Sequence, residues 1–117
     1  ARAVLLRVLP DEELGDAGGR LARLWEQRGA RDSALALLGS LIARDGDGEH
    51  GPAWLAEVVH VHRRADDWFA ADAAVERLLL TYGPGTAGAS SNTEALCEKA
   101  QRELAISIHR AALEAGP

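Results

Sequence analysis

One pair of residues has the spacing of a metal-binding step, in which a glutamate and a histidine stand three positions apart. Glu57 and His60 fit this step, which on a helix puts a carboxylate and an imidazole on one face. Di-iron helical bundles need a second such step and two more glutamates from facing helices. His109 supplies no second step, because Ile106 stands three residues before it. We therefore expect a surface or groove pair and no cofactor, with a metal-binding helical bundle as an alternative that elemental analysis would test.

The other candidate ligands and nucleophiles favour structural roles. His60 and His62 diverge by roughly 200° around a helix, so they cannot chelate one ion together. We expect His62 to be a hydrogen-bonded interior histidine. Cys97 is the only cysteine, which leaves no internal disulfide, and its place near an apolar seam predicts a small core residue. No serine has a catalytic histidine and acid around it, and no phosphate loop follows a strand, so we expect no catalysis.

An acidic segment resembles a calcium loop only in part. Asp45, Asp47 and Glu49 alternate as calcium ligands do. An EF-hand loop needs glycine at its sixth position and glutamate at its twelfth, where this chain has His50 and Ala56. We therefore interpret residues 45–51 as a solvated connection between helices.

Local signals predict two helices in the first half of the chain and a third that begins near its middle. The first two are expected over residues 16–28 and 31–44, separated by Gly29. Pro52 suits the first turn of the third helix, where a missing N–H has no cost. The buried stripe of this third helix is predicted to be Trp54, Leu55, Val58, Val59 and His62.

Two further helices are predicted in the second half. The fourth spans residues 68–82 and takes its N-cap from Asp66-Asp67. The fifth begins at Ser91, whose capping partner would be Glu94 three residues on. It should cover the open face of the preceding helix pair with an apolar seam of Leu96, Ala100, Leu104, Ile108 and Ala111.

The composition favours helices and argues against two kinds of partner. The 117 residues fit one compact domain, and an apolar set rich in alanine and leucine, with 4% aromatic residues, predicts an all-α fold. A net charge of -5 argues against nucleic-acid binding. No apolar run approaches the roughly 18 residues of a membrane span, so we expect no direct membrane insertion. The lack of methionine predicts a piece of a longer protein, and the dominance of arginine over lysine indicates a GC-rich genome.

The apolar positions repeat after 37 residues. Successive members are separated by 4, 9, 4, 3 and 5 residues in both copies. Repeats of this length indicate stacked helical hairpins, and such arrays bind other proteins far more often than they catalyse. The first copy is Leu21, Trp25, Ala34, Leu38, Leu41 and Gly46, and the second is Val58, His62, Ala71, Val75, Leu78 and Gly83.

These positions resemble the tetratricopeptide repeat, whose pattern pairs Leu and Tyr on its first helix with Ala, Phe, Ala and Pro on its second. The small residue, Ala34 or Ala71, stands where the two helices of a hairpin cross closely. The resemblance covers about residues 15–85 and implies an α-solenoid fragment of antiparallel hairpins. It divides the chain into the tail of a preceding helix or repeat with its linker (1–14), two hairpins with the following loop (15–92) and a capping helix (93–117).

A narrower likeness concerns the C-terminal part of the chain. The segment Leu80-Thr81-Tyr82-Gly83-Pro84-Gly85-Thr86, with a long helix ending in Ile108-His109-Arg110-Ala111-Ala112, resembles the end of tetratricopeptide proteins associated with myxobacterial adventurous gliding motility. This likeness implies a scaffold of the bacterial cell envelope. The bacterial cytoplasm stays open as the other location.

The resemblance also implies a concave groove lined by the first helix of each hairpin and by the last helix. Arg63 and Arg64 would offer forked donors to carboxylates of a partner, or would complement the dipole of a helix C-terminus. The clamp that some members use for a free carboxyl terminus needs asparagines in the groove, and none stands there. The groove positions carried over to this chain are Arg23, Glu26, Gln27, His60, Arg63 and Arg64.

We therefore expect a non-catalytic scaffold module of a larger protein, which binds a protein or peptide segment in this groove. A regulatory or substrate-docking module cut from a multidomain enzyme, such as a kinase or protease, is the alternative that the parent sequence would distinguish. Because a stable solenoid usually needs three or more repeats, we expect neighbouring segments or self-association to cover the exposed repeat ends.

Overall fold

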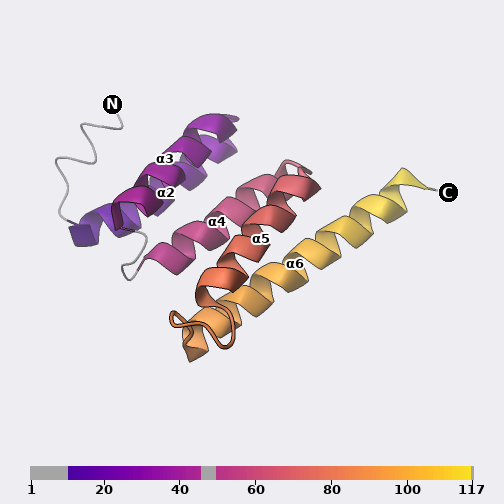
Figure 1. Ribbon diagram of the computed structural model, residues 1–117. Coiled ribbons are helices and arrows are strands. Elements are labelled where there is room, and N and C mark those ends of the chain that lie inside the picture. The colour runs from indigo at the N-terminus through magenta and orange to yellow at the C-terminus, as the bar shows by residue number, and fades with distance from the viewer. Residues whose placement is uncertain (1–10, 46–49, 117) are drawn as a thin grey trace. The chain divides into compact units, whose positions relative to one another are not determined.

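The computed structural model describes residues 11–45 and 50–116, with side chains for 19–44 and 50–116. Within these ranges every regular element is an α-helix, which confirms the predicted all-α class (Figure 1). Residues 1–10, which belong to the predicted tail of a preceding helix or repeat, and the acidic segment 45–49 lie outside the described side chains. The five helices are α2 (Asp11–Gln27), α3 (Arg31–Asp45), α4 (Gly51–Arg64), α5 (Trp68–Tyr82) and α6 (Ser91–Ala115).

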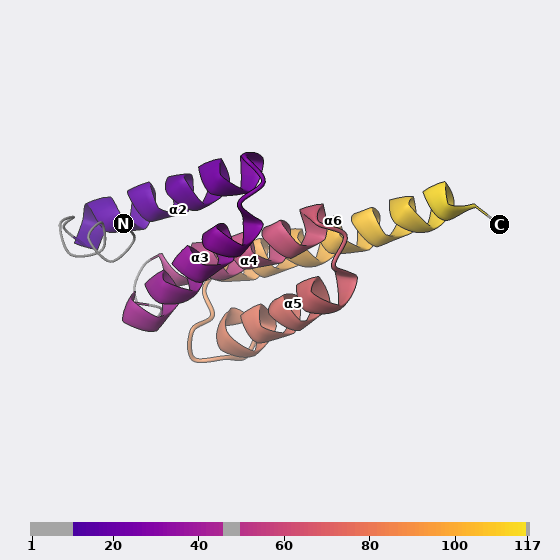
Figure 2. The ribbon, with the colours of Figure 1, turned by 90° about the horizontal axis from the view of Figure 1, so that it is seen from above.

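The chain divides into two compact units, Ala1–Trp54 and Leu55–Pro117, and the boundary falls inside α4. In the first unit α2 packs against α3, and in the second α5 packs against α6 (Figure 2). Side chains of α4 also reach α6 within the second unit. Each unit therefore holds its own helix pairings.

Both units bury small and branched apolar side chains at the repeated positions. Ala34 and Ala71, the predicted close-crossing residues, have no exposed surface. Burial of each leucine in these cores contributes roughly 1.5–3 kcal/mol. The residues with no exposed surface are Ala22, Ala34, Leu37, Leu38 and Leu41 in the first unit and Val59, Val61, Ala71 and Leu78 in the second.

The turn between α2 and α3 is closed by a left-handed residue. Gly29 has φ of 84°, a conformation that costs other residues roughly 1–2 kcal/mol. Its N–H donates to the carbonyl of Glu26 at 3.0 Å, and the N–H of Ala30 donates to the carbonyl of Trp25 at 2.7 Å. These two bonds form a Schellman motif, which satisfies carbonyls at the end of α2.

The turn between α4 and α5 repeats this geometry 37 residues later. Asp66 has φ of 60° and donates its N–H to the carbonyl of Arg63 at 3.1 Å. The N–H of Asp67 donates to the carbonyl of His62 at 3.0 Å. Aspartate is one of the few residues that tolerate this conformation, because its short polar side chain bonds locally. The period read from apolar side chains is thus also a period of the backbone.

Most ends of the first four described helices follow the same period of 37 residues. Both ends of α5 lie 37 residues after those of α3, and α4 ends 37 residues after α2. Asp67 caps α5 as predicted, because its carboxylate accepts from the N–H of Ala70 at 3.2 Å. Gly83 ends α5, again as predicted.

One predicted helix start and one predicted capping box were wrong, whereas α6 begins at Ser91 as predicted. The first helix begins at Asp11 rather than at residue 16, so the glycines at 15, 18 and 19 lie inside it. Acidic residues at 11–13 occupy its first turn, where the helix dipole favours negative charge. The cap of α6 is Ser90, not Ser91, and its partner is Thr93, whose hydroxyl accepts from the N–H of Ser90 at 2.7 Å.

The apolar seam of α6 is buried only in its first half. Cys97, Ala100 and Leu104 are buried, whereas Ile108 is 41% exposed. The cause is length, because α6 has 25 residues and α5 has 15, or about 37 Å against about 22 Å. The last turns of α6 therefore extend past the core of the second unit.

The left-handed turn predicts opposite effects for two glycine substitutions in the first unit. Gly29→Ala has open space for its Cβ but must adopt a φ of 84°, so we expect a loss of about 1 kcal/mol. Gly39→Ala also has open space but lies inside α3, so we expect a gain of about 1 kcal/mol. Urea unfolding measures both changes. Effects of the same sign would contradict the turn geometry.

Candidate functional site

The six predicted groove residues fall in two different units. Arg23, Glu26 and Gln27 stand on α2 in the first unit. Arg23 and Gln27 are exposed and border a shallow hollow of about 320 Å³ with Arg20 and Leu24. Glu26 is half-buried. The structure therefore brings Arg23 and Gln27 to one hollow on α2 within the first unit.

In the second unit, Arg63 is held inside the fold. Its Nη1 donates to Oγ of Ser107 at 3.1 Å, and its Nη2 lies 3.7 Å from Oε2 of Glu103. Its Nε donates to Nδ1 of His60 at 3.4 Å. All three nitrogens of the guanidinium are thus engaged, and two of them join α4 to α6.

Arg64 is engaged within α4. Its Nη2 lies 2.8 Å from Oε2 of Glu57, which is a short charge-assisted hydrogen bond. Glu57 is half-buried, so this bond neutralises a carboxylate that stands away from bulk water. Arg63 and Arg64, predicted as donors to a partner, therefore both have acidic partners within the second unit.

His60 is neutral at pH 7 in this setting. Burial lowers its pKa from the ordinary value, an effect that the charge of Glu103 opposes and that of Arg63 reinforces. The neutral ring leaves Nδ1 free to accept the hydrogen bond from Arg63. Glu103 Oε2 lies 3.5 Å from the same Nδ1, so a protonated ring would pair with that carboxylate instead.

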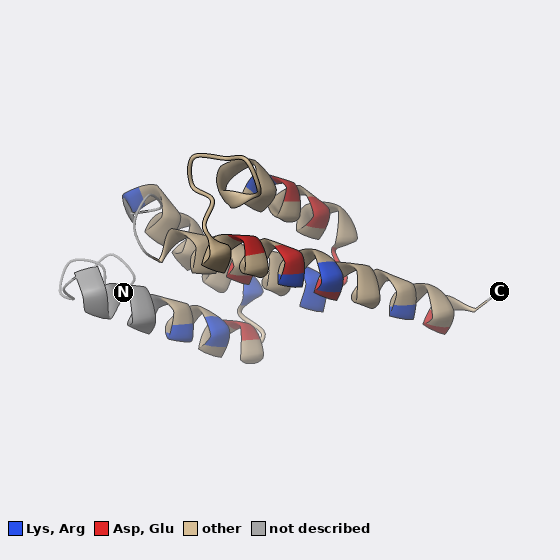
Figure 3. Ribbon diagram, turned by 90° about the horizontal axis from the view of Figure 1, so that it is seen from below, with Lys and Arg blue, Asp and Glu red and all other residues tan. Residues whose placement is uncertain are grey.

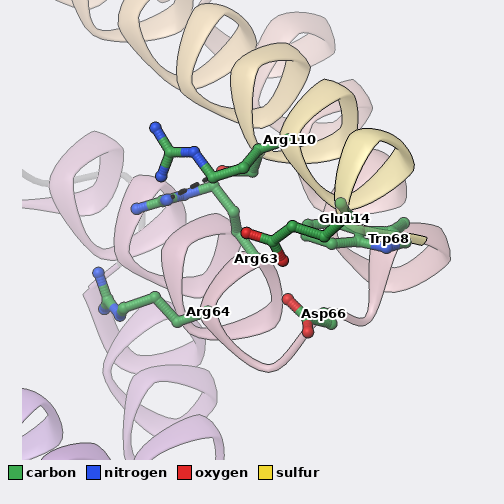
Figure 4. A pocket seen from close by; sticks show the side chains of 8 residues that line it. Arg63, Arg64, Asp66, Trp68, Arg110 and Glu114 are labelled. Atoms are coloured by element: carbon green, nitrogen blue, oxygen red, sulfur yellow. Dashed lines mark hydrogen bonds between the residues drawn. The ribbon is translucent and has the colours of Figure 1, made fainter. Parts of the chain in front are cut away.

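A hollow of about 180 Å³ lies beside these contacts, wholly within the second unit (Figure 4). It forms where the end of α4, the start of α5 and the last turns of α6 meet. We call it the Trp68 hollow, after the indole in its wall. Its lining residues are Arg63, Arg64, Asp66, Trp68, Ser107, Arg110, Ala111 and Glu114.

Three charged side chains of the Trp68 hollow have no side-chain partner in the described part of the chain. Asp66, Arg110 and Glu114 make no side-chain hydrogen bond or ion pair with any residue that the structure describes. In Figure 4 the carboxylates of Asp66 and Glu114 turn toward the same space beside the indole, while Arg110 points toward Arg63. The hollow therefore has an acidic side next to Trp68 and a basic side next to α4.

The sequence contained a signal for the α6 side of this site. Glu103, Ser107, Arg110 and Glu114 follow at intervals of 4, 3 and 4 residues, which places them on one helical face. Figure 3 shows acidic and basic residues following one another along α6. The prediction for this helix named only its apolar seam and did not include the polar stripe.

Two other predictions have outcomes here. His62 was predicted to be hydrogen-bonded, which is wrong, because its buried Nδ1 has no partner in the described part of the chain. Cys97 is confirmed as a core residue, being 2% exposed with its thiol directed at the carbonyl of Leu78 at 3.9 Å.

Two searches bear on metals and membranes. Among residues with described side chains, no group of three or more His, Cys, Asp or Glu could hold a metal ion. The predicted Glu57 and His60 step instead meets Arg64 and Arg63. None of the helices described here is long and apolar enough to cross a bilayer.

The burial of Cys97 predicts low reactivity. Burial raises the pKa of its thiol, and the negative charge of Glu94 raises it further. We expect a disulfide reagent such as DTNB to react at least about tenfold more slowly with the folded protein than with the unfolded protein. Complete labelling of the folded protein at the unfolded rate would contradict this packing.

The setting of His60 predicts a pH-dependent stability. Because its pKa is lowered from 6.5, its contribution is fully present above that value and is lost as the pH falls through the lower folded pKa. We expect the free energy of unfolding to fall more steeply below about pH 6.5 in the wild type than in His60→Gln. His109→Gln, exposed on α6, is the control. An unchanged slope in His60→Gln would refute this setting.

Comparison with known proteins leaves the chain without an assigned family, since no family model, no curated protein and no solved structure matches it.

Proposed function

We propose that this chain is a non-catalytic protein-binding module, built from two tetratricopeptide-like hairpins and closed by α6. The observation that supports it most is the 37-residue period, which governs apolar positions, helix ends and turn hydrogen bonds alike. Repeated hairpins of one design serve as scaffolds whose surfaces differ from copy to copy. Here Arg23 and Glu26 on α2 correspond to His60 and Arg63 on α4.

The Trp68 hollow is the proposed contact site. Its volume of about 180 Å³ is smaller than the roughly 300–1,000 Å³ of small-molecule pockets, so it suits one side chain of a larger partner. Tryptophan and arginine are the residues that most often dominate binding energy at interfaces. Arg63 and Arg64 of the predicted groove line the hollow. His60 accepts a hydrogen bond from Arg63 and so supports this side of the hollow.

Two exposed apolar side chains adjoin lining residues of the hollow in the sequence. Phe69 is 89% exposed and Leu113 is 68% exposed, and they are the chain neighbours of Trp68 and Glu114. Large apolar side chains with this exposure mark interaction surfaces when they gather near one site.

Filling the hollow tests the proposed function. Peptides selected from a random display library against the folded protein should lose at least about tenfold in affinity for Ala111→Gln, which puts a neutral side chain into the hollow. The matched control is Ala112→Gln, the next residue on α6, which is exposed and outside the lining. Its affinity should stay within about twofold.

Two results would contradict the proposed function. One is a library that yields no peptide binding the folded protein above the heat-unfolded protein. The other is a set of peptides that bind the two glutamine variants, Ala111→Gln and Ala112→Gln, equally well. Circular dichroism melting of both variants establishes that each is folded during the comparison.

A further inference from the structure

We infer that the Trp68 hollow takes a basic side chain, an arginine or lysine of the partner, against the indole and between Asp66 and Glu114. The inference rests on the proposed function only in placing that side chain on a protein. It reverses the sequence expectation, in which the arginines of α4 would meet carboxylates of the partner. The reason is that Arg63 and Arg64 already pair with acidic residues of the same unit.

The basic side of the hollow is largely neutralised from within. Arg63 pairs with Glu103 at 3.7 Å, and Arg64 pairs with Glu57 at 2.8 Å. An anionic ligand would have to compete with both carboxylates for these guanidinium groups. Only Arg110 brings positive charge to the hollow without a side-chain partner among the described residues.

The acidic side is open. Asp66 and Glu114 both line the hollow and have no ion pair with any described residue. Figure 4 shows their carboxylates directed to one space at the rim of the Trp68 indole. Two unneutralised carboxylates there outweigh the single unneutralised arginine, so the local field favours a cation.

Trp68 adds an apolar wall that suits the stem of a basic side chain. Trp68 is half-buried, so the apolar stem of an arginine or lysine can lie along it while the charge reaches the two carboxylates. The net charge of -5 would further speed the approach of a basic partner.

Asp66 is held in place by the fold. It occupies the left-handed position of the turn between α4 and α5, with its N–H bonded to the carbonyl of Arg63. The rigid turn fixes where its carboxylate leaves the backbone, which lowers the ordering cost of binding. Asparagine tolerates the same backbone conformation, so Asp66→Asn removes the charge without disturbing the turn.

Small blocked peptides test the charge preference directly. The probes are acetyl-Ala-Arg-Ala-amide, the same peptide with citrulline for arginine, and the same peptide with glutamate. The readout is the indole N–H signal of Trp68 in a two-dimensional nitrogen–proton NMR spectrum, assigned by its loss in Trp68→Phe. We expect a saturable shift with the arginine peptide and no saturable shift with the citrulline or glutamate peptide.

A matched pair of double variants separates the site from net charge. Asp66→Asn with Glu114→Gln should weaken binding of the arginine peptide at least about fivefold. Asp72→Asn with Glu76→Gln removes the same charge from exposed positions of α5 outside the lining and should leave binding within about twofold. Equal losses in both pairs would show general charge attraction and overturn the inference.

Further outcomes distinguish this inference from the proposed function. A Trp68 signal that responds to no probe, or equally to the citrulline or glutamate peptide, overturns the inference. If library peptides then bind the hollow through acidic residues, the proposed function stands without it. If the arginine peptide binds but no library peptide does, the cation site stands and the proposed function fails.

Discussion

The guanidinium of Arg63 is the contact on which the rest of the site depends. It joins α4 to α6 through Ser107 and Glu103, and it holds His60 as a neutral acceptor. Arg63 stands at 21% side-chain exposure, so these bonds form partly shielded from water, where they are stronger than at the surface. The apolar packing against α5 holds the first half of α6, and this contact joins its polar face to the end of α4.

This contact also decides how charge is distributed around the Trp68 hollow. Because Arg63 and Arg64 are neutralised inside the unit, the charges left for a partner belong to Asp66, Arg110 and Glu114. A residue type that suggests binding to an acidic partner thus has a structural role, and the available surface favours the opposite charge. The two units repeat the same turn geometry and bury apolar cores, and the proposed recognition occurs where the copies differ.

The sequence was sufficient for the helices but not for the site. Helix ends and turns depend on nearby residues, such as the left-handed Gly29 and the cap Asp67, so their pattern can be read locally. The capping box of α6 shows the limit, because the cap is Ser90 and the hydroxyl of Thr93 replaces the expected glutamate as its partner. The bond from Arg63 to Ser107 spans 44 residues, and no local pattern specifies which acid or hydroxyl an arginine will meet.

A double-mutant cycle on Arg63 and Glu103 tests this account most directly. The free energies of unfolding of the wild type, Arg63→Ala, Glu103→Ala and the double variant give the coupling between the two side chains. If Arg63 fastens α6 within the fold, the coupling should be favourable by at least about 0.5 kcal/mol. Additive effects within about 0.3 kcal/mol would show that Arg63 does not depend on Glu103, and would contradict the account.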